Sequence, residues 1–258
     1  MTKKQLITLI FSGLFFLGLY FGTDIRASKQ DKIDKKRNLE TTGIDIAPFL
    51  KKAKSSIEPA KLTFINLEEE KLRSVNDTQK VVILKELASA WYKYDKPIIS
   101  GHYAEKIAVS LSTDESWSIA GTTFLIGLRQ AKTELEKKYC TEHAVKAFEN
   151  AISLDSDNIN HKLNLALVYV ENAPKDTPMK GIMMLLDLNK KYPDNISVLL
   201  TLGRLGLKTN QLKKAIARLE KVLALDDENS TAICLLADAY NRIGNQEKAE
   251  VFSKKCSR

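Results

Sequence analysis

The sequence predicts an all-α fold in which about five helix-turn-helix repeats stack into an α-solenoid. A short motif recurs with its small residue at Ala88, Gly121, Ala166, Gly203 and Ala237, at spacings of 33, 45, 37 and 34 residues. A period of about 34 residues is typical of stacked helical hairpins. Apolar residues also recur at steps of three and four, and no segment alternates with a period of two over a useful length. Helices are therefore expected throughout, and strands are not.

The N-terminus is predicted to attach the chain to a membrane. Residues 1–4 form a short basic start, and residues 5–23 then carry no charge. A helix of that length spans roughly 28 Å, close to the hydrocarbon thickness of a bilayer. Two interpretations remain, a cleaved export signal and an uncleaved transmembrane anchor. A cleaved signal needs small residues three and one positions before the cut, and no such pair lies around Tyr20–Arg26, which favours the anchor.

A charged stalk is predicted over residues 24–43. Residues 1–37 carry a net charge of +5 out of the total of +8. A basic stretch beside an apolar segment suits anionic lipid headgroups better than nucleic acid. We expect a single-pass protein of the bacterial inner membrane. The Lys and Arg count favours the cytoplasm for the repeats, whereas an export signal would carry them outward. The count tips the expectation slightly towards the cytoplasm.

Residues 44–78 are predicted to form capping helices that cover the first repeat. One helix includes Pro48 and runs to Ile57, and the next runs from Pro59 to Val75, because proline suits the first turn of a helix. The expected apolar stripe of these helices includes Leu62, Ile65, Leu67 and Leu72. A separate dimerising segment is the alternative.

The repeat domain is predicted over residues 79–258. Each repeat consists of a first helix, helix A, and a second helix, helix B, and Asp, Asn and Ser in the turns cap the next helix. The second repeat holds about eleven extra residues within 129–143, which should lengthen both of its helices. Pro174 and Pro178 separate the helices of the third repeat. Met179, Met183 and Met184 are expected to fill the core.

These repeats resemble the tetratricopeptide repeat family over about two-thirds of the chain. The fourth repeat fits the family pattern well, at Leu199, Leu202, Gly203, Ala215, Leu219, Val222 and Asp227. The first repeat fits least well, and Gly206 replaces the usual aromatic residue of the fourth. The resemblance implies a right-handed superhelix whose concave groove is lined by the A helices and binds a protein or peptide.

Carried onto this chain, the groove positions of the family give candidate partner-binding residues. In the last three repeats they include Asn160, Leu163, Leu167, Arg204, Leu207, Lys208, Asp238, Asn241 and Arg242. The second repeat contributes Glu115, Ser118, Thr122, Leu125 and Ile126. An apolar floor with three positive charges suits a peptide or helix that carries apolar anchors and an acidic group, such as a C-terminal carboxylate. The alternative is that these charges are simply a solvated surface.

No catalytic, cofactor-binding or metal site is predicted. The chain has no glycine-rich phosphate loop, nucleophile elbow or zinc-binding helix motif. Cys140 and His143 are close in sequence, but two further ligands are missing nearby, and an exposed loop is expected there. Cys234 and Cys256 are expected to be small packing residues of a cytoplasmic domain, whereas export would allow a disulfide between them.

The sequence therefore predicts a non-catalytic, membrane-anchored scaffold that binds a protein or peptide partner in its groove. The alternative is an assembly factor or chaperone subunit for an exported or membrane enzyme, as in cytochrome maturation. The expected partners are a protein or peptide and the membrane, without nucleic acid. The identity of the partner and the oligomeric state are not predicted.

Overall fold

The computed structural model describes residues 43–256, apart from the side chains of Asp77 and Thr78. These residues form twelve helices and no strand, which confirms the all-α prediction for this part of the chain. The helices are α3 (Ala47–Lys54), α4 (Pro59–Ser74), α5 (Asp77–Lys93), α6 (Pro97–Leu111), α7 (Asp114–Gln130), α8 (Glu134–Leu154), α9 (Ile159–Glu171), α10 (Lys180–Lys191), α11 (Ile196–Lys208), α12 (Leu212–Leu225), α13 (Ser230–Arg242) and α14 (Gln246–Cys256).

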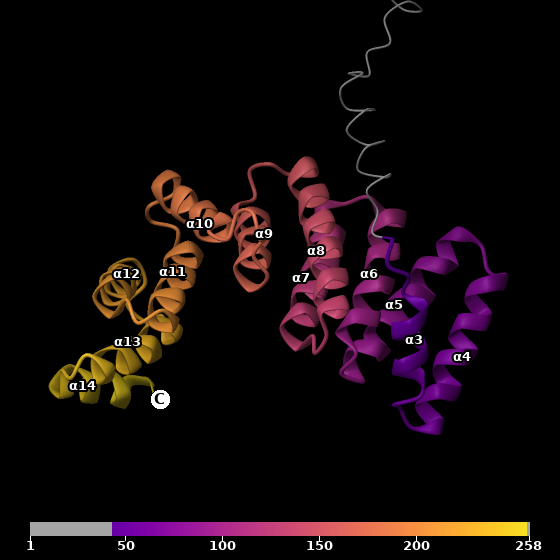
Figure 1. The fold of residues 1–258 in the computed structure, drawn as a ribbon, viewed down its shortest axis with the longest axis horizontal. Coiled ribbons are helices and arrows are strands. Elements are labelled where there is room, and N and C mark those ends of the chain that lie inside the picture. The colour runs from indigo at the N-terminus through magenta and orange to yellow at the C-terminus, as the bar shows by residue number, and fades with distance from the viewer. Residues whose placement is uncertain (1–42, 257–258) are drawn as a thin grey trace, which may run out of the picture. The chain divides into compact units, whose positions relative to one another are not determined.

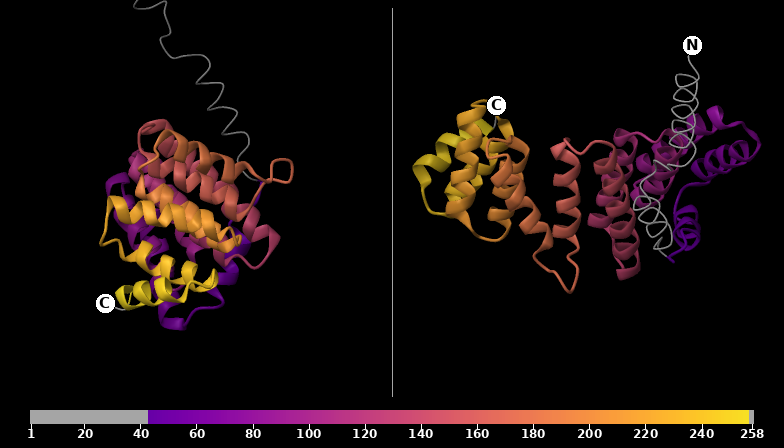
Figure 2. Two further views of the ribbon diagram at one scale, coloured as in Figure 1. Left: turned by 90° about the vertical axis from the view of Figure 1, so that its left-hand side faces the viewer. Right: turned by 90° about the horizontal axis from the view of Figure 1, so that it is seen from above.

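Helices α5 to α14 form five successive hairpins, in which α5, α7, α9, α11 and α13 are the A helices (Figure 1). Each helix contacts the next one along the chain, and α7 also contacts α9 as α11 contacts α13. Contacts between neighbouring A helices are what stacking of hairpins requires. The further views in Figure 2 show the same succession of paired helices.

Polar residues in the turns begin the A helices as predicted. The side chains of Asn158, Asn195 and Asn229 accept hydrogen bonds from the first-turn N–H groups of α9, α11 and α13. Thr113 and Thr133 form capping boxes at the starts of α7 and α8. These bonds satisfy N–H groups that have no partner within the helix, so the turns define where each helix starts.

The insertion in the second repeat lengthens helix B as predicted, but helix A is no longer than that of the first repeat. Helix α8 has 21 residues, whereas α6, α10, α12 and α14 have 15, 12, 14 and 11. Helix α7 has 17 residues, as α5 does, and α9, α11 and α13 have 13 each. The segment 172–179, which contains Pro174 and Pro178, separates α9 from α10.

Two expectations about apolar side chains are wrong. Leu67 is 50% exposed, and Glu68 is buried in its place, with its carboxylate 2.6 Å from the Lys71 ammonium. Met179 and Met183 are 56% and 61% exposed, whereas Met184 packs against the core. In α4, and in α10 with its N-cap residue Met179, some apolar side chains face no neighbouring helix. Periodicity therefore overestimates how many apolar side chains are buried.

The predicted anchor of residues 5–23 and the stalk of residues 24–43 lie outside the described residues, except for Gly43. Among the helices of residues 43–256, none combines the length and apolarity needed to cross a bilayer.

Candidate functional site

The predicted groove residues lie on the A helices α9, α11 and α13, but the structure divides them into two groups. Six are exposed, namely Asn160, Arg204, Lys208, Asp238, Asn241 and Arg242. Leu167 is half-buried, and Leu163 and Leu207 are only 6% and 5% exposed.

Leu163 and Leu207 belong to the core of the repeats. Leu163 lies in a cluster with Leu185 and Val198, and Leu207 lies in the cluster of α11 to α14. Their side chains are therefore covered by neighbouring hairpins. The floor expected from these leucines is not available to a ligand, although the polar positions beside them are.

The positive charges of the predicted groove differ in their environments. The Arg242 guanidinium lies 3.5 Å from the Asp238 carboxylate and donates a hydrogen bond of 3.3 Å to the Asn210 side chain. Arg204 and Lys208 lie one turn apart on α11, and neither forms an ion pair with any residue of the range 43–256. Arg204 and Lys208 are therefore the cations of this surface that remain free to meet an acidic group.

A hollow of about 600 Å³ lies between α13 and α14 and includes the predicted residues Asp238 and Asn241. Its lining also contains Glu247 and Glu250, which the sequence analysis did not select because they lie on helix B. The C-terminal end of the predicted surface is therefore acidic, in contrast to the positive charge expected there.

A second hollow, of about 430 Å³, lies where α5, α6 and α7 meet. Tyr92 and Ile119 line it and are 52% and 62% exposed, and Leu111 at its edge is 42% exposed. We call this the helix A hollow. Among its lining residues, only Glu115 was predicted as a groove residue. The signal that would have found Tyr92 is its place in helix A of the first repeat, to which the groove positions were not extended.

The segment around Cys140 is not an exposed loop, which corrects the expectation. Cys140 is fully buried within α8, and burial raises the pKa of its thiol to about 12. His143, one turn further on, lies 2.6 Å from the Glu105 carboxylate, which also binds the Lys146 ammonium at 3.0 Å. Burial alone would raise the pKa of Glu105, but the bonds to His143 and Lys146 outweigh it and lower that pKa. This group is a buried polar link between α6 and α8.

One group of three possible metal ligands occurs among the described residues. Asp114, Asp155 and His161 each offer a ligand atom within 4.8 Å of the others. Hydrogen bonds account for these positions, because His161 Nε2 lies 3.1 Å from Asp114 and Asp155 accepts the N–H groups of Asp157 and Asn158. The Asp114–His161 contact thus joins the starts of α7 and α9, whereas Asp155 bonds within the turn between α8 and α9.

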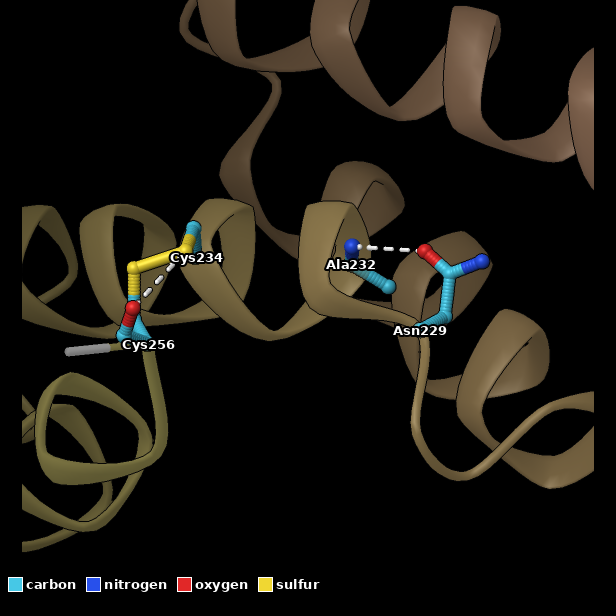
Figure 3. The surroundings of a disulfide bond; sticks show 4 residues. All are labelled: Asn229, Ala232, Cys234 and Cys256. Atoms are coloured by element: carbon cyan, nitrogen blue, oxygen red, sulfur yellow. Dashed lines mark hydrogen bonds between the residues drawn. A yellow bond between two sulfur atoms is a disulfide. The ribbon is translucent and has the colours of Figure 1, made fainter. Parts of the chain in front are cut away.

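Cys234 and Cys256 form a disulfide between α13 and α14, with their Cα atoms 5.0 Å apart (Figure 3). The expectation of two packing thiols is therefore wrong, and the bridge that export would allow is the arrangement observed.

Comparison with known proteins gave one family match and several similar solved structures of low identity. Residues 196–229 match the family model of the tetratricopeptide repeat. A crystal structure of MamA is 15% identical, with a TM-score of 0.44 over 66% of this chain and 92% of that chain. MamA from Desulfovibrio magneticus RS-1, residues 41 to the end, is also 15% identical, with a TM-score of 0.44 over 69% and 93%.

A further solved structure is that of YrrB, described as a TPR protein with an unusual peptide-binding site. It is 15% identical, with a TM-score of 0.39 over 73% of this chain and 90% of that chain. These similarities are too weak to carry an argument about function, and no curated protein matches the chain. The matched segment is 34 residues long and contains α11 and α12, so residues 196–229 form a tetratricopeptide repeat.

Proposed function

We propose that this protein is a non-catalytic, membrane-anchored scaffold whose A helices bind a protein or peptide partner. The observation that carries the proposal is the helix A hollow, where large apolar side chains remain exposed beside a cavity. Soluble proteins cover apolar surface where they can, so clustered exposed apolar side chains mark sites for a partner. Tyrosine is enriched in such interfaces because it offers a large contact area at a low cost in conformational entropy.

The partner that fits this surface carries apolar anchors and at least one acidic group. Tyr92 and Ile119 would receive the anchors, and Arg204 and Lys208 would pair with a carboxylate. Glu247 would favour a basic group further along the same partner, because Asp238 already pairs with Arg242 and Glu250 with Lys254. An extended peptide or a helix can present these groups in that order.

The experiment is a crosslinking pull-down with the N-terminal segment intact, followed by identification of the captured proteins. The double variant Tyr92→Ala/Ile119→Asp should remove the specific partner from the captured set. Charge reversal of Arg204, Lys208 and Arg242 should weaken capture of the same partner. The matched control reverses Lys190, Lys213 and Lys214, which are exposed on B helices.

Circular dichroism should show that every variant remains folded. Equal capture by the Tyr92→Ala/Ile119→Asp variant and the unaltered protein would remove the helix A hollow from the proposal. Equal capture after charge reversal of Arg204, Lys208 and Arg242 would show that these cations do not bind the partner.

A second candidate function is supported by the disulfide. Disulfides persist in oxidising compartments and are rare in the cytosol. The Cys234–Cys256 bridge therefore favours a repeat domain outside the cytoplasm, against the count of basic residues. In that position the protein would suit the role of an assembly factor for an exported or membrane enzyme. Identification of a haem-linked or redox enzyme among the captured proteins would favour this role over a general scaffold.

A protease-protection experiment tests on which side of the membrane the repeat domain lies. Intact spheroplasts would be treated with protease, with permeabilised spheroplasts as the control. Digestion of the repeats in intact spheroplasts is expected if the domain is exported. Protection in the intact sample and digestion in the permeabilised one would place the domain in the cytoplasm.

A further inference from the structure

A cavity of about 530 Å³ lies beside α3 and shares no lining residue with the two hollows described above. It is bounded by α3, the turn between α5 and α6, the end of α7 and the start of α8. Its volume falls in the range of about 300–1,000 Å³ that is common for small-molecule sites. The cavity therefore has the dimensions of a ligand site.

Helix α3 is a fixed wall of this cavity. The Phe49 ring lies 5.2 Å from the Tyr139 ring of α8, and the Lys52 ammonium lies 3.1 Å from the Glu136 carboxylate. Phe49 and Ala53 are both buried. These contacts tie α3 to α8 at one edge, and α3 also contacts α6.

The floor of the cavity is apolar. It consists of Phe49, Ala53, Pro97, Ile98, Ile99 and Gly127. Gly127 also lines the cavity, and a Cβ atom there would lie 3.2 Å from both Ile98 Cγ1 and Cys140 Sγ, so its lack of a side chain allows α7 to approach α6 and α8 closely. Such a floor favours an apolar ligand surface.

The rim of the cavity carries charged groups, and most of them already have partners. The Glu136 carboxylate accepts hydrogen bonds from Lys52 and from the backbone N–H groups of Lys132 and Thr133. The Asp95 carboxylate accepts the side-chain amide of Gln130 at 3.2 Å.

Unlike the Lys52 ammonium, the ammonium groups of Lys96 and Lys132 have no partner of opposite charge within the described range 43–256. Helix α6 begins at Pro97, and its N-cap residue Lys96 forms no side-chain cap hydrogen bond, so the helix start adds positive potential at the same rim. Asp95 is the one rim carboxylate without a lysine partner, so the balance of the unpaired charges is positive. An anionic group is therefore the natural complement of this rim.

We propose that this cavity binds a small amphipathic carboxylate, whose apolar tail lies on the floor and whose carboxylate is held by Lys96 and Lys132. A peptide would bring N–H and C=O groups that need partners, and the rim groups Glu136, Asp95 and Gln130 are already bonded to their neighbours. An acyl tail needs no such partners, so the apolar floor suits it better. The site is independent of the partner surface on the A helices.

The test is photoaffinity labelling of the full chain with an octanoate analogue that carries a diazirine in its tail. Mass spectrometry should place the label on residues 49–56 or 95–99, and excess octanoate should suppress it. An alcohol with the same tail and diazirine should label these residues about tenfold less, because it lacks the charge. Labelling confined to other segments, or equal labelling by the alcohol, would overturn the proposal.

Two variants test the residues. The double variant Lys96→Gln/Lys132→Gln should reduce labelling about tenfold, whereas the control Lys190→Gln/Lys213→Gln should leave it unchanged. Ser56→Trp, at an exposed position on the cavity wall, should block the site while preserving the circular dichroism spectrum. Unchanged labelling in both cavity variants would refute the site. If a peptide with a C-terminal carboxylate suppressed the labelling and octanoate did not, the assignment of a small amphipathic carboxylate as the ligand would be refuted.

Discussion

At the scale of single residues, the close approaches between helices depend on what surrounds each glycine. A Cβ atom on Gly203 would meet the end of the Leu219 side chain at 2.8 Å. A Cβ atom on Gly181 would instead meet backbone, with Ala166 O and Val170 N both at 2.6 Å. A side-chain end can rotate away, whereas a helix backbone can only shift as a whole.

Gly181→Ala should therefore lower the free energy of unfolding by about 2 kcal/mol or more, despite the better helix propensity of alanine. Gly203→Ala is the matched control and should change it by less than about 1 kcal/mol. Urea denaturation followed by circular dichroism measures both. Similar losses in the two variants would contradict the distinction between backbone and side-chain contacts.

His102 gives the protein a specific sensitivity to acid. Burial, with a further contribution from Lys106, lowers the pKa of His102 from 6.5 to about 4. The unfolded chain therefore takes up a proton at this residue before the folded chain does. Stability that is present at neutral pH is then lost as the pH falls from about 6.5 to about 4.

Between pH 7 and pH 4.5 the unaltered protein should lose about 2 kcal/mol more unfolding free energy than the variant His102→Gln. Chemical denaturation at a series of pH values gives the two curves. The curves should diverge below about pH 6.5, and parallel curves would show that His102 titrates normally in the folded protein.

At the scale of the elements, the last hairpin depends on its covalent link more than the others do. Helix α14 contains one buried residue, Ala249, and Val251 on the same helix is 50% exposed. Phe252 of α14 also stacks on the Tyr240 ring of α13, with ring centroids 5.7 Å apart, so few side chains supply the apolar attachment. The Cys234–Cys256 disulfide closes a sequence separation of 22 residues across this hairpin.

Replacing both cysteines, in Cys234→Ser/Cys256→Ser, should lower the free energy of unfolding by about 3 kcal/mol. Thiol titration provides the chemical check. The native protein should react at no thiol, because Cys140 is buried and its pKa is raised. The denatured, unreduced protein should react at one thiol, and reaction of three would show that the bridge is absent.

At the scale of the whole molecule, the described residues hold several apolar clusters rather than one. One cluster extends from Phe49 to Tyr169, another from Leu199 to Ala249, and a third links α9 to α11. In stacked repeats each hairpin is stabilised by its neighbours, so a local defect should destabilise locally.

Leu219→Ala and Leu87→Ala test this expectation, because both leucines are fully buried but lie in different clusters. Each should cost about 2–5 kcal/mol in its own region. In hydrogen exchange, Leu219→Ala should reduce protection in α11 to α14, and Leu87→Ala should reduce it in α5 to α8. A uniform loss of protection in both variants would indicate a single cooperative unit.

The sequence by itself determined the helices, the turns that start them and the long second repeat. These features follow from local rules, since periodicity, proline and capping residues act within a few positions of the chain. The family model over residues 196–229 agrees with the repeat that fitted the pattern well.

Only the tertiary structure decided which of these side chains remain available. Leu163 is covered because another hairpin packs over it, and Met183 is exposed because none does. The hollows, the cavity beside α3 and the Cys234–Cys256 bridge join segments that are distant in sequence. Helical periodicity marks the apolar side of each helix, but the burial of a given side chain depends on what neighbours it in space.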